Sequence, residues 1–283
     1  METRAAGEKM NPILLVLFYL VILFGAFISL YPFYWMIVIA SNSREAAFKM
    51  PPEWMIGTNF VDNISKAFAR IDFLNALGNS FFVASVTTIA VLFFCSLGGY
   101  AFAKYNFPGK KFLFGFVLFT LLVPSQLSVL PVYVIMSKLA WIDTYKALII
   151  PAMASAFGIF WMRQYITTSV HSELIEAGRI DGCSHFRVYW NIAVPIILPA
   201  FATLGIFTFL NTWNDFFWPL VILKNESKYT IQLVLSQLNS LREGVDYGMI
   251  LSAIFLATLP LMVVFLLFSR WFINGITSGS VKG

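Results

Sequence analysis

The segment from His171 to Pro199 reads HSELIEAGRIDGCSHFRVYWNIAVPIILP and lies between two long apolar runs. It contains Glu176-Ala177-Gly178, then Asp181-Gly182-Cys183, then an apolar stretch that carries Pro195 and Pro199. A chain that only had to cross a bilayer would not need so long and so ordered a connection between spans. The segment is therefore predicted to have a function of its own.

The composition indicates that the rest of the chain lies mostly in a membrane. Of its 283 residues, 59% are hydrophobic and 12% charged, and the mean hydropathy is +0.79. A soluble domain of this length could not bury so much apolar surface, because its surface-to-volume ratio is too high. The formal net charge of +5 is spread over several loops without a basic run, so nothing favours nucleic-acid binding.

Six apolar runs are long enough to cross the hydrocarbon core, which takes about 20 residues. Each is expected to be helical, because an isolated strand would leave backbone polar groups unpaired in lipid. The prediction is one all-α integral membrane domain over residues 1–283, with spans at about 12–40, 76–103, 112–137, 147–166, 193–223 and 248–272. The first run is longer than a signal-peptide core of about 7–15 residues and is read as a retained span.

Prolines interrupt several of these runs. Proline is commoner in membrane helices than in soluble ones, so a single proline carries little information. The cluster Val123-Pro124-Ser125-Gln126 is more informative, because a helix break coincides there with polar side chains. Broken helices are tolerated where neighbours or a cavity satisfy the freed carbonyls.

The polar segment itself predicts two short helices joined by a turn. Residues 172–179 contain good helix formers, with Ser172 as a plausible N-cap. Gly178 and Gly182 would allow a partner's backbone to approach closely and the chain to turn. Residues 186–192 then read as an amphipathic helix near the headgroups. From the residues alone, an interfacial hairpin that only anchors the loop explains the segment equally well.

With Glu-Ala-Gly, Asp-Gly and the trailing Val-Pro in register, the segment resembles the EAA loop of ABC importer permeases. Two further stretches narrow the resemblance to the carbohydrate-uptake permeases. Residues 213–220 (WNDFFWPL) resemble the fifth span of those proteins, and residues 270–283 resemble the C-terminus of one maltose permease subunit. The resemblance implies a type I importer fold with six transmembrane helices.

The resemblance also assigns roles to residues. In the family, the loop, here residues 167–192, docks onto a cytoplasmic ATPase, and its first Glu pairs with a basic residue of that ATPase. The positions that match are Glu176, Ala177, Gly178, Asp181 and Gly182, with Gly178 in place of the family's second alanine. The C-terminal tail, 273–283, would reach the interface between two ATPases through Ser280, Val281, Lys282 and Gly283. By composition alone, this Gly- and Ser-containing tail reads as a disordered end.

An importer of this kind implies several partners. These are a second homologous permease subunit, two ATPase subunits, an extracytoplasmic solute-binding protein and membrane lipid. No P-loop is present, so ATP and Mg²⁺ are expected on the ATPase subunits, with no cofactor bound by this chain. His171 and His185 lack a third ligand, so no metal site is expected either.

The resemblance places the chain in a bacterial or archaeal inner membrane with both termini in the cytoplasm. The 19 Lys and Arg residues divide almost evenly between the two sets of loops. The positive-inside rule therefore does not orient the chain, and this orientation depends on the EAA resemblance alone.

A candidate substrate path comes from an acid in an apolar run. Asp215 is flanked by Trp213 and Asn214, and Gln126 lies at the Pro124 break. An acid inside a membrane usually faces a bundle interior or a water-filled path, and polar groups beside tryptophan suit a sugar. Equally, Asp215 could lie near the outer interface and cap or pair with a neighbouring helix.

The last candidate surface is the outer segment 229–241. In the family, the corresponding loop faces the binding protein, a role that fits Gln237, Asn239 and Ser240. Its apolar residues have helical spacing and fit at least as well against the outer ends of the chain's own spans.

The function expected from all of this is a sugar or oligosaccharide permease subunit without catalytic residues. The alternatives are an ABC permease for another solute, a stand-alone secondary transporter or channel, and a membrane-embedded enzyme. A secondary transporter would need coupling charges or an inverted repeat, and the sequence offers neither beyond Asp215.

Overall fold

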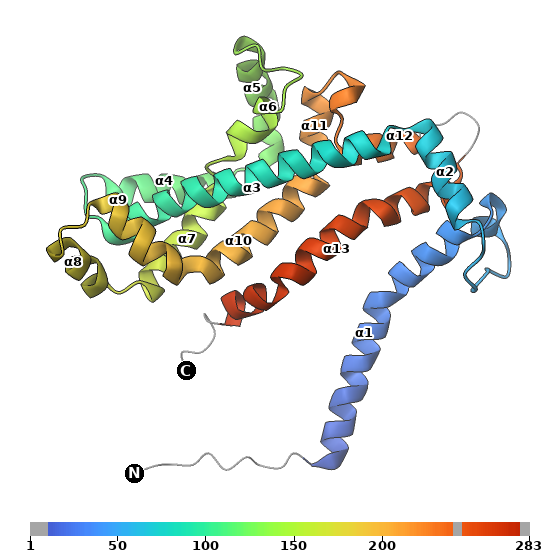
Figure 1. The fold of residues 1–283 in the computed structure, drawn as a ribbon, viewed down its shortest axis with the longest axis horizontal. Coiled ribbons are helices and arrows are strands. Elements are labelled where there is room, and N and C mark those ends of the chain that lie inside the picture. Colours follow the sequence, from blue (N-terminus) through green and yellow to red (C-terminus); the bar gives the residue numbers. More distant parts are fainter. Residues whose placement is uncertain (1–10, 240–244, 278–283) are drawn as a thin grey trace. The chain divides into compact units, whose positions relative to one another are not determined.

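The computed structural model describes residues 11–239 and 245–277, and the regular structure within these ranges is helical (Figure 1). This confirms the all-α class. In chain order the elements are α1 (Pro12–Ser41), η1 (Arg44–Phe48), α2 (Phe60–Arg70), α3 (Phe73–Lys104), α4 (Lys110–Leu122), α5 (Ser125–Lys138), α6 (Lys146–Ile149), η2 (Ile150–Ala152), α7 (Ala156–Ser169), α8 (Ser172–Ile180), α9 (His185–Val188), η3 (Tyr189–Ala193), α10 (Val194–Asn214), α11 (Phe217–Ile222), η4 (Glu226–Lys228), α12 (Ile231–Leu238) and α13 (Tyr247–Thr277).

Five helical segments among the described residues are long and apolar enough to cross a membrane, and six if the bent pair α4–α5 counts as one span. The five are 12–41, 73–104, 146–169, 185–214 and 247–269. Each overlaps one of the runs predicted from hydropathy. The structure differs from the prediction in the third and fifth runs, because each of them is interrupted by a helix break.

The predicted span 112–137 is two helices, α4 and α5, whose axes differ by 108°. Proline explains the position of the break, because Pro124 lacks an N–H and its ring would clash with the carbonyl of Thr120. The last turn of α4 tightens accordingly, and the Val123 N–H donates to the Thr120 carbonyl at 3.4 Å.

The predicted span 193–223 is likewise not one helix, since α10 ends at Asn214 and α11 begins at Phe217. Pro219 would clash with the carbonyl of Asp215 if the helix continued. Instead, the Asp215 carboxylate accepts a hydrogen bond from the Trp218 backbone N–H at 3.3 Å and caps α11.

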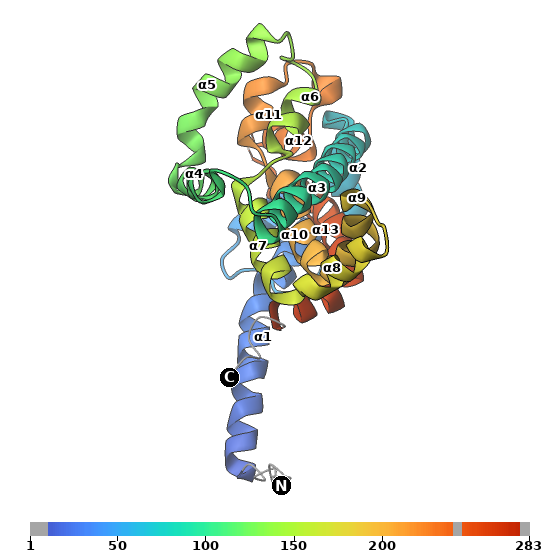
Figure 2. The ribbon, with the colours of Figure 1, turned by 90° about the vertical axis from the view of Figure 1, so that its left-hand side faces the viewer.

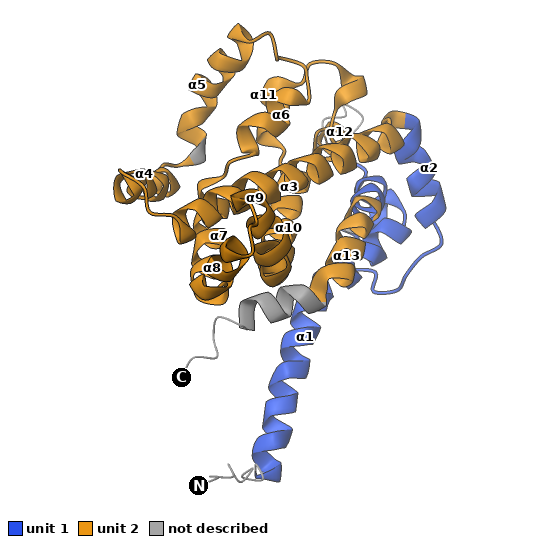
Figure 3. Cartoon of the chain, turned by 60° about the vertical axis from the view of Figure 1, so that its left-hand side comes forward, with its two compact units in different colours: residues 1–69, 242–255 blue, residues 70–241, 256–283 orange. Residues whose placement is uncertain are grey.

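The chain divides into two compact units, coloured separately in Figure 3. Unit 1 comprises residues 1–69 and 242–255. Its α1 is exposed from residue 12 to 34, on every side, as expected of a helix surrounded by lipid or by another subunit. At the other end of α1, the buried Asn63 donates to the carbonyls of Ala40 and Asn42, both at 2.9 Å. This amide fastens α2 to the end of α1.

Unit 2 comprises residues 70–241 and 256–283, and its centre is the packing of α3, α7 and α10 against one another (Figure 2). Small residues allow two of these helices to approach closely. A Cβ at Gly99 of α3 would lie 2.7 Å from Cβ of Met162 and 2.8 Å from the backbone nitrogen of Arg163, both on α7. Helices in membranes associate largely through such close packing.

Candidate functional site

The segment that follows α7 contains the motif residues and consists of α8, a tight turn, α9 and η3 (Figure 1). η3 is a single π-helical turn at Tyr189–Ala193 that leads directly into α10. Single π-helical turns within helices are frequent at functional sites. We refer to residues 172–193 as the coupling segment.

The turn after α8 is a Schellman motif centred on Gly182. The Cys183 N–H donates to the carbonyl of Gly178 at 3.0 Å, and the Gly182 N–H donates to that of Arg179 at 3.1 Å. Gly182 has φ +81°, in the left-handed region where glycine avoids the steric cost of a Cβ. The chain turns here as the sequence predicted.

Gly178 has a different environment from the one the sequence suggested. It is buried, and a Cβ there would lie 2.6 Å from Cδ1 of Ile192 and 3.4 Å from Cγ2 of Val188. The close approach at Gly178 therefore involves the chain's own α9–η3 region. Together with the buried Ile175, Gly178 forms the inner side of α8.

The outer side of α8 is exposed and combines acidic with apolar side chains. Glu176, Ala177 and Asp181 lie in this exposed part, as does Gly182. Sequence reasoning missed Ile180, whose side chain is 86% exposed. Its spacing from Ala177 (i, i+3), and from Glu176 (i, i+4), is the signal that could have identified it. An exposed isoleucine beside two carboxylates is suited to a protein partner with a basic, partly apolar cleft.

Two polar contacts join the coupling segment to the C-terminal part of α3 and the residue after it, and a third joins the last residue of α3 to the residue after α7. The Tyr189 hydroxyl lies 2.6 Å from the Ser96 hydroxyl, and both groups are buried. The Tyr105 hydroxyl hydrogen-bonds to Nδ1 of His185 at 2.8 Å, and the Lys104 ammonium group donates to the carbonyl of Val170.

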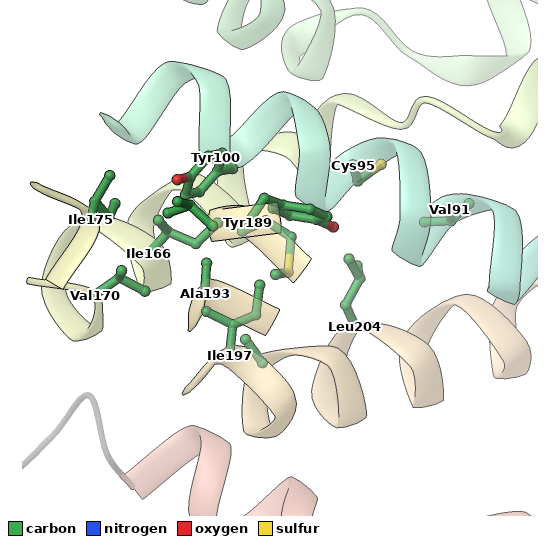
Figure 4. Close-up of a cluster of buried hydrophobic side chains, with 13 residues drawn as sticks. Val91, Cys95, Tyr100, Ile166, Val170, Ile175, Tyr189, Ala193, Ile197 and Leu204 are labelled. Atoms are coloured by element: carbon green, nitrogen blue, oxygen red, sulfur yellow. The ribbon is translucent and has the colours of Figure 1, made fainter. Parts of the chain in front are cut away.

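Tyr189 and Val170, which take part in two of these contacts, belong to a buried hydrophobic cluster (Figure 4). Its members come from α3, α7, α8 and η3–α10, and they include Val91, Cys95, Ile166, Ile175, Tyr189, Ile197 and Leu204. Because α8 and the bundle share one buried cluster, the coupling segment is packed as part of the bundle and is not a loose loop.

Two aromatic rings of the coupling segment face outward. Phe186 and Trp190 are exposed and stacked, with ring centroids 6.2 Å apart. Their neighbours Val188 and Tyr189 are buried. This is the amphipathic pattern that the sequence predicted for residues 186–192, with aromatic side chains of the kind found at membrane interfaces.

The polar residues near the helix breaks line a cavity of about 770 Å³ in unit 2. Gln126 and Asp215, both predicted for a substrate path, line it. Asp215 also caps α11, so the same residue lines the cavity and caps a helix. The remaining lining residues are Val83, Thr87, Ser128, Val129, Val132, Leu148, Pro151, Ala152, Asn211, Thr212, Phe217, Trp218, Pro219 and Thr230.

The two other residues predicted for the path lie elsewhere. Trp213 is 1% exposed and stacks on Phe209 with ring centroids 5.7 Å apart, so it belongs to the packing of α10. Asn214 is exposed, donates to the Leu210 carbonyl at 2.9 Å and is absent from the cavity wall. Trp218 is the tryptophan that lines the cavity, where its indole N–H donates to the Ala147 carbonyl at 3.0 Å.

In the segment 229–241, α12 buries its apolar side within the chain. Ile231, Leu233, Val234, Leu235 and Leu238 are all buried, as expected if they pack on the chain's own helices. Gln237 is half-buried and Asn239 is exposed. Ser240 lies outside the described residues, as do the tail residues Ser280, Val281, Lys282 and Gly283.

An ion pair that was not predicted from the sequence joins the loop at Asp143 to the loop that contains Lys228. Asp143, at φ +60°, accepts from the ammonium group of Lys228 at 2.8 Å and from the backbone N–H groups of Lys224 and Asn225 at 3.0 and 3.1 Å. The Lys228 ammonium group and the two backbone donors lower the pKa of Asp143 to about 2.

No group of three or more His, Cys, Asp or Glu side chains that could hold a metal ion occurs in the described part of the chain. The described arrangement offers an exposed side of α8 and a cavity with polar groups on its wall.

Comparisons with known proteins show similarity to membrane components of transport systems. A family described as "Binding-protein-dependent transport system inner membrane component" matches residues 95–278. The chain is 33% identical over 282 residues to the arabinooligosaccharides transport system permease protein AraQ of Halalkalibacterium halodurans, covering 98% of this chain and 99% of that protein. It is 33% identical over 264 residues to the lactose transport system permease protein LacG of Rhizobium radiobacter, covering 93% and 95%.

A third relative has a different named solute. The chain is 29% identical over 265 residues to the sn-glycerol-3-phosphate transport system permease protein UgpE of Yersinia enterocolitica, covering 91% of this chain and 94% of that protein. Among solved structures, one from a bacterial ABC transporter that imports the acidic polysaccharide alginate superposes with a TM-score of 0.81. It covers 95% of this chain and 100% of the solved chain at 21% identity, which shows a shared fold.

Proposed function

We propose, because this chain belongs to the family of inner membrane components of binding-protein-dependent transport systems, that it is a permease subunit of an ATP-driven importer for sugars or oligosaccharides. The observation that carries the proposal is the exposed outer side of α8, held firmly against the helical bundle. Such an element can receive a movement from a partner and pass it to the spans. The solute class follows the names of AraQ and LacG.

The proposed partner of α8 is a cytoplasmic ATPase subunit. Glu176 is exposed and lies near Ala177 and Ile180, so a cleft with a basic residue and apolar walls would accept this surface. ATP and Mg²⁺ would bind to that partner, and closure of two ATPases would move α8. This chain would then contribute the movement of its spans and no catalytic group.

The complete assembly that we propose has a second, homologous permease subunit, two ATPase subunits and an extracytoplasmic solute-binding protein. Both termini would lie in the cytoplasm, which puts α8 on the ATPase side and the pair Asp143–Lys228 on the outer side. Gln237, Asn239 and Ser240 would face the binding protein. The C-terminal residues 280–283 would reach the interface between the ATPases.

The test is the reversal of charge at Glu176. Glu176→Lys should abolish ATP-driven sugar uptake while the protein stays in the membrane, because removing one partner of a buried, hydrogen-bonded charge pair costs about 3–5 kcal/mol. At about 1.4 kcal/mol per tenfold, this corresponds to at least a hundredfold loss of productive docking. Uptake into membrane vesicles and the amount of co-purified ATPase would be measured together.

The matched control is Glu226→Lys, which makes the same charge change on the exposed η4 turn, far along the chain from α8. This variant should keep the wild-type rate of sugar uptake and co-purify the same amount of ATPase. If Glu176→Lys also retains ATP-driven uptake, α8 is not the coupling element and the proposed function is wrong.

A further inference from the structure

The cavity of about 770 Å³ contains two hydroxyl groups that need a partner. Thr87 and Thr230 line it and are only 1% and 5% exposed. Neither Oγ1 makes a hydrogen bond within the described chain. Buried polar groups in native proteins nearly always have a hydrogen-bond partner, which can be a protein group or an ordered water. A polar occupant of the cavity, either water or a ligand, would supply the missing partners.

The wall around these hydroxyls is suited to a sugar. Asn211 and Thr212 come from the last turn of α10, and Gln126 comes from the start of α5. Amides and hydroxyls both donate and accept hydrogen bonds, as sugar hydroxyls do. Trp218 and Phe217 add aromatic surface, against which the apolar face of a sugar ring can pack. The volume lies within the usual range of about 300–1,000 Å³ for ligand sites.

The charge of the wall restricts the class of sugar. Among the residues that line the cavity in the described chain, Asp215 has the only ionisable side chain. A carboxylate has about four acceptor positions, and the Trp218 N–H uses one on Oδ1. Sugar hydroxyls can donate to the others. An anionic ligand would lose water here without a cationic partner, which is unfavourable.

We propose that this cavity is a binding site for a neutral sugar unit, in which Asp215 and Asn211 bind hydroxyls and Thr87 and Thr230 complete the set. The inference rests on the proposed function and narrows its solute class to neutral sugars, as against sugar acids and sugar phosphates. It also gives this subunit direct contact with the transported molecule.

The test measures occupancy of the cavity directly. A Thr212→Cys variant of the complete transporter, in membrane vesicles, is treated with N-ethylmaleimide, and modification of that peptide is followed by mass spectrometry. Lactose and arabinotriose are the neutral probes; sn-glycerol 3-phosphate and digalacturonate are the anionic ones. A neutral sugar at high millimolar concentration should slow the modification at least fivefold, and the anions should not.

Two controls separate occupancy from general effects. Asn214→Cys lies in the same region of α10 but outside the cavity, and its modification rate should be the same with and without sugar. The native Cys183, half-buried in the coupling segment, provides the same control within each sample. The near-isosteric Thr87→Val, added to Thr212→Cys, removes one unpartnered hydroxyl. This substitution should raise the sugar concentration needed for half-maximal protection about tenfold, as expected for the loss of one hydrogen bond.

Each other outcome overturns the proposal. No reaction at position 212 without sugar means that the cavity is closed to water. Reaction without protection by either neutral sugar means that no sugar binds, and equal protection by the anions removes the charge argument. If Thr87→Val leaves protection unchanged, the hydroxyl has no role in binding. ATP-driven uptake by the same vesicles separates the two hypotheses: protection without uptake refutes the proposed function, and uptake without protection refutes the cavity site.

Discussion

Two glycines of the coupling segment, Gly178 and Gly182, should respond in opposite ways to the same substitution. Gly182 has φ +81°, and a Cβ there would meet nothing within 4 Å. The cost of Gly182→Ala is therefore purely that of the backbone, about 1–2 kcal/mol for a residue with a Cβ in the left-handed region. That cost increases local opening of the turn about 5- to 30-fold.

Gly178 has no such backbone constraint, since it lies inside α8. Alanine there gains up to about 1 kcal/mol of helix propensity. The new Cβ would lie 2.6 Å from Cδ1 of Ile192, which is the far end of a half-buried side chain and can rotate away. We therefore expect Gly178→Ala to be neutral or stabilising by up to about 1 kcal/mol.

Hydrogen exchange of the purified transporter, read by mass spectrometry over residues 178–188, measures this local opening. The amides of Gly182 and Cys183 donate the two hydrogen bonds of the turn. Their protection should fall 5- to 30-fold in Gly182→Ala and should largely return in Gly182→Asn, because asparagine tolerates the left-handed region. In Gly178→Ala it should stay constant or rise.

The reasoning is refuted if Gly178→Ala exposes the turn as much as Gly182→Ala does, or if Gly182→Asn is no better than Gly182→Ala. Either result would mean that a partner's close approach, and not the conformation of this chain, requires glycine at these positions. A loss of uptake with unchanged protection in Gly182→Ala would lead to the same conclusion.

Two further predictions concern contacts away from α8. The low pKa of Asp143, about 2, means that its contribution to stability is present above its unfolded pKa of about 3.9 and is lost as pH falls towards 2. Limited proteolysis of the 224–228 loop should therefore accelerate below pH 4 in the wild type, whereas Asp143→Asn should be cleaved faster at pH 6 with little further change. At the end of α3, Ser96→Ala should cost about 1–3 kcal/mol, because it leaves the buried Tyr189 hydroxyl unpaired. Tyr189→Phe should cost less, because the Ser96 hydroxyl keeps its hydrogen bond to the Phe93 carbonyl at 3.0 Å. The double variant, in a denaturant titration, should cost clearly less than the sum, and strict additivity would show that the two hydroxyls do not interact.

Much of the architecture could be predicted because a bilayer imposes simple requirements. A helix that crosses it must be long and apolar, so the run at 12–40 predicts α1 almost to the residue. The family could be predicted from the coupling segment, because Glu176, Gly182 and their spacing form a local pattern. Gly182 was also correctly assigned to a turn, since the left-handed conformation it adopts is a local property of the backbone.

The faces of the buried helices could not be predicted in the same way. α10 is apolar around its whole circumference, so no hydrophobic periodicity shows which side faces a cavity. For this reason the sequence does not show that Asn211, Thr212 and Trp218 line the cavity, whereas Trp213 and Asn214, which it predicts for a substrate path, do not. Prolines do not locate the helix breaks on their own either. Pro199 lies inside the continuous helix α10, whereas Pro219 lies in α11, shortly after the break that follows Asn214.

One helix connects the two candidate sites. α10 follows the π-helical turn η3, which begins at Tyr189. The last turn of α10 contains Asn211 and Thr212, which line the cavity. The 21 residues of α10 correspond to a length of about 30 Å. Where Pro199 removes a backbone donor, the Thr203 hydroxyl donates to the Pro199 carbonyl at 3.2 Å, and the Trp161 indole donates to the Ala200 carbonyl at 3.3 Å.

The first contact lies within α10 and supports the helix next to Pro199, and the second joins the middle of α10 to α7. If the proposed ATPase displaces α8, the packing of Ile175 and Gly178 on the α9–η3 region should change, and a rotation of η3 should be passed along α10. Because Asn211 and Thr212 lie at the far end of the same helix, that rotation also changes the wall of the cavity. The movement of one helix would then link the coupling segment to the proposed sugar site. An insertion of one residue after Thr203, which would turn the last half of α10 by about 100°, should preserve docking of the ATPase and abolish sugar protection at position 212.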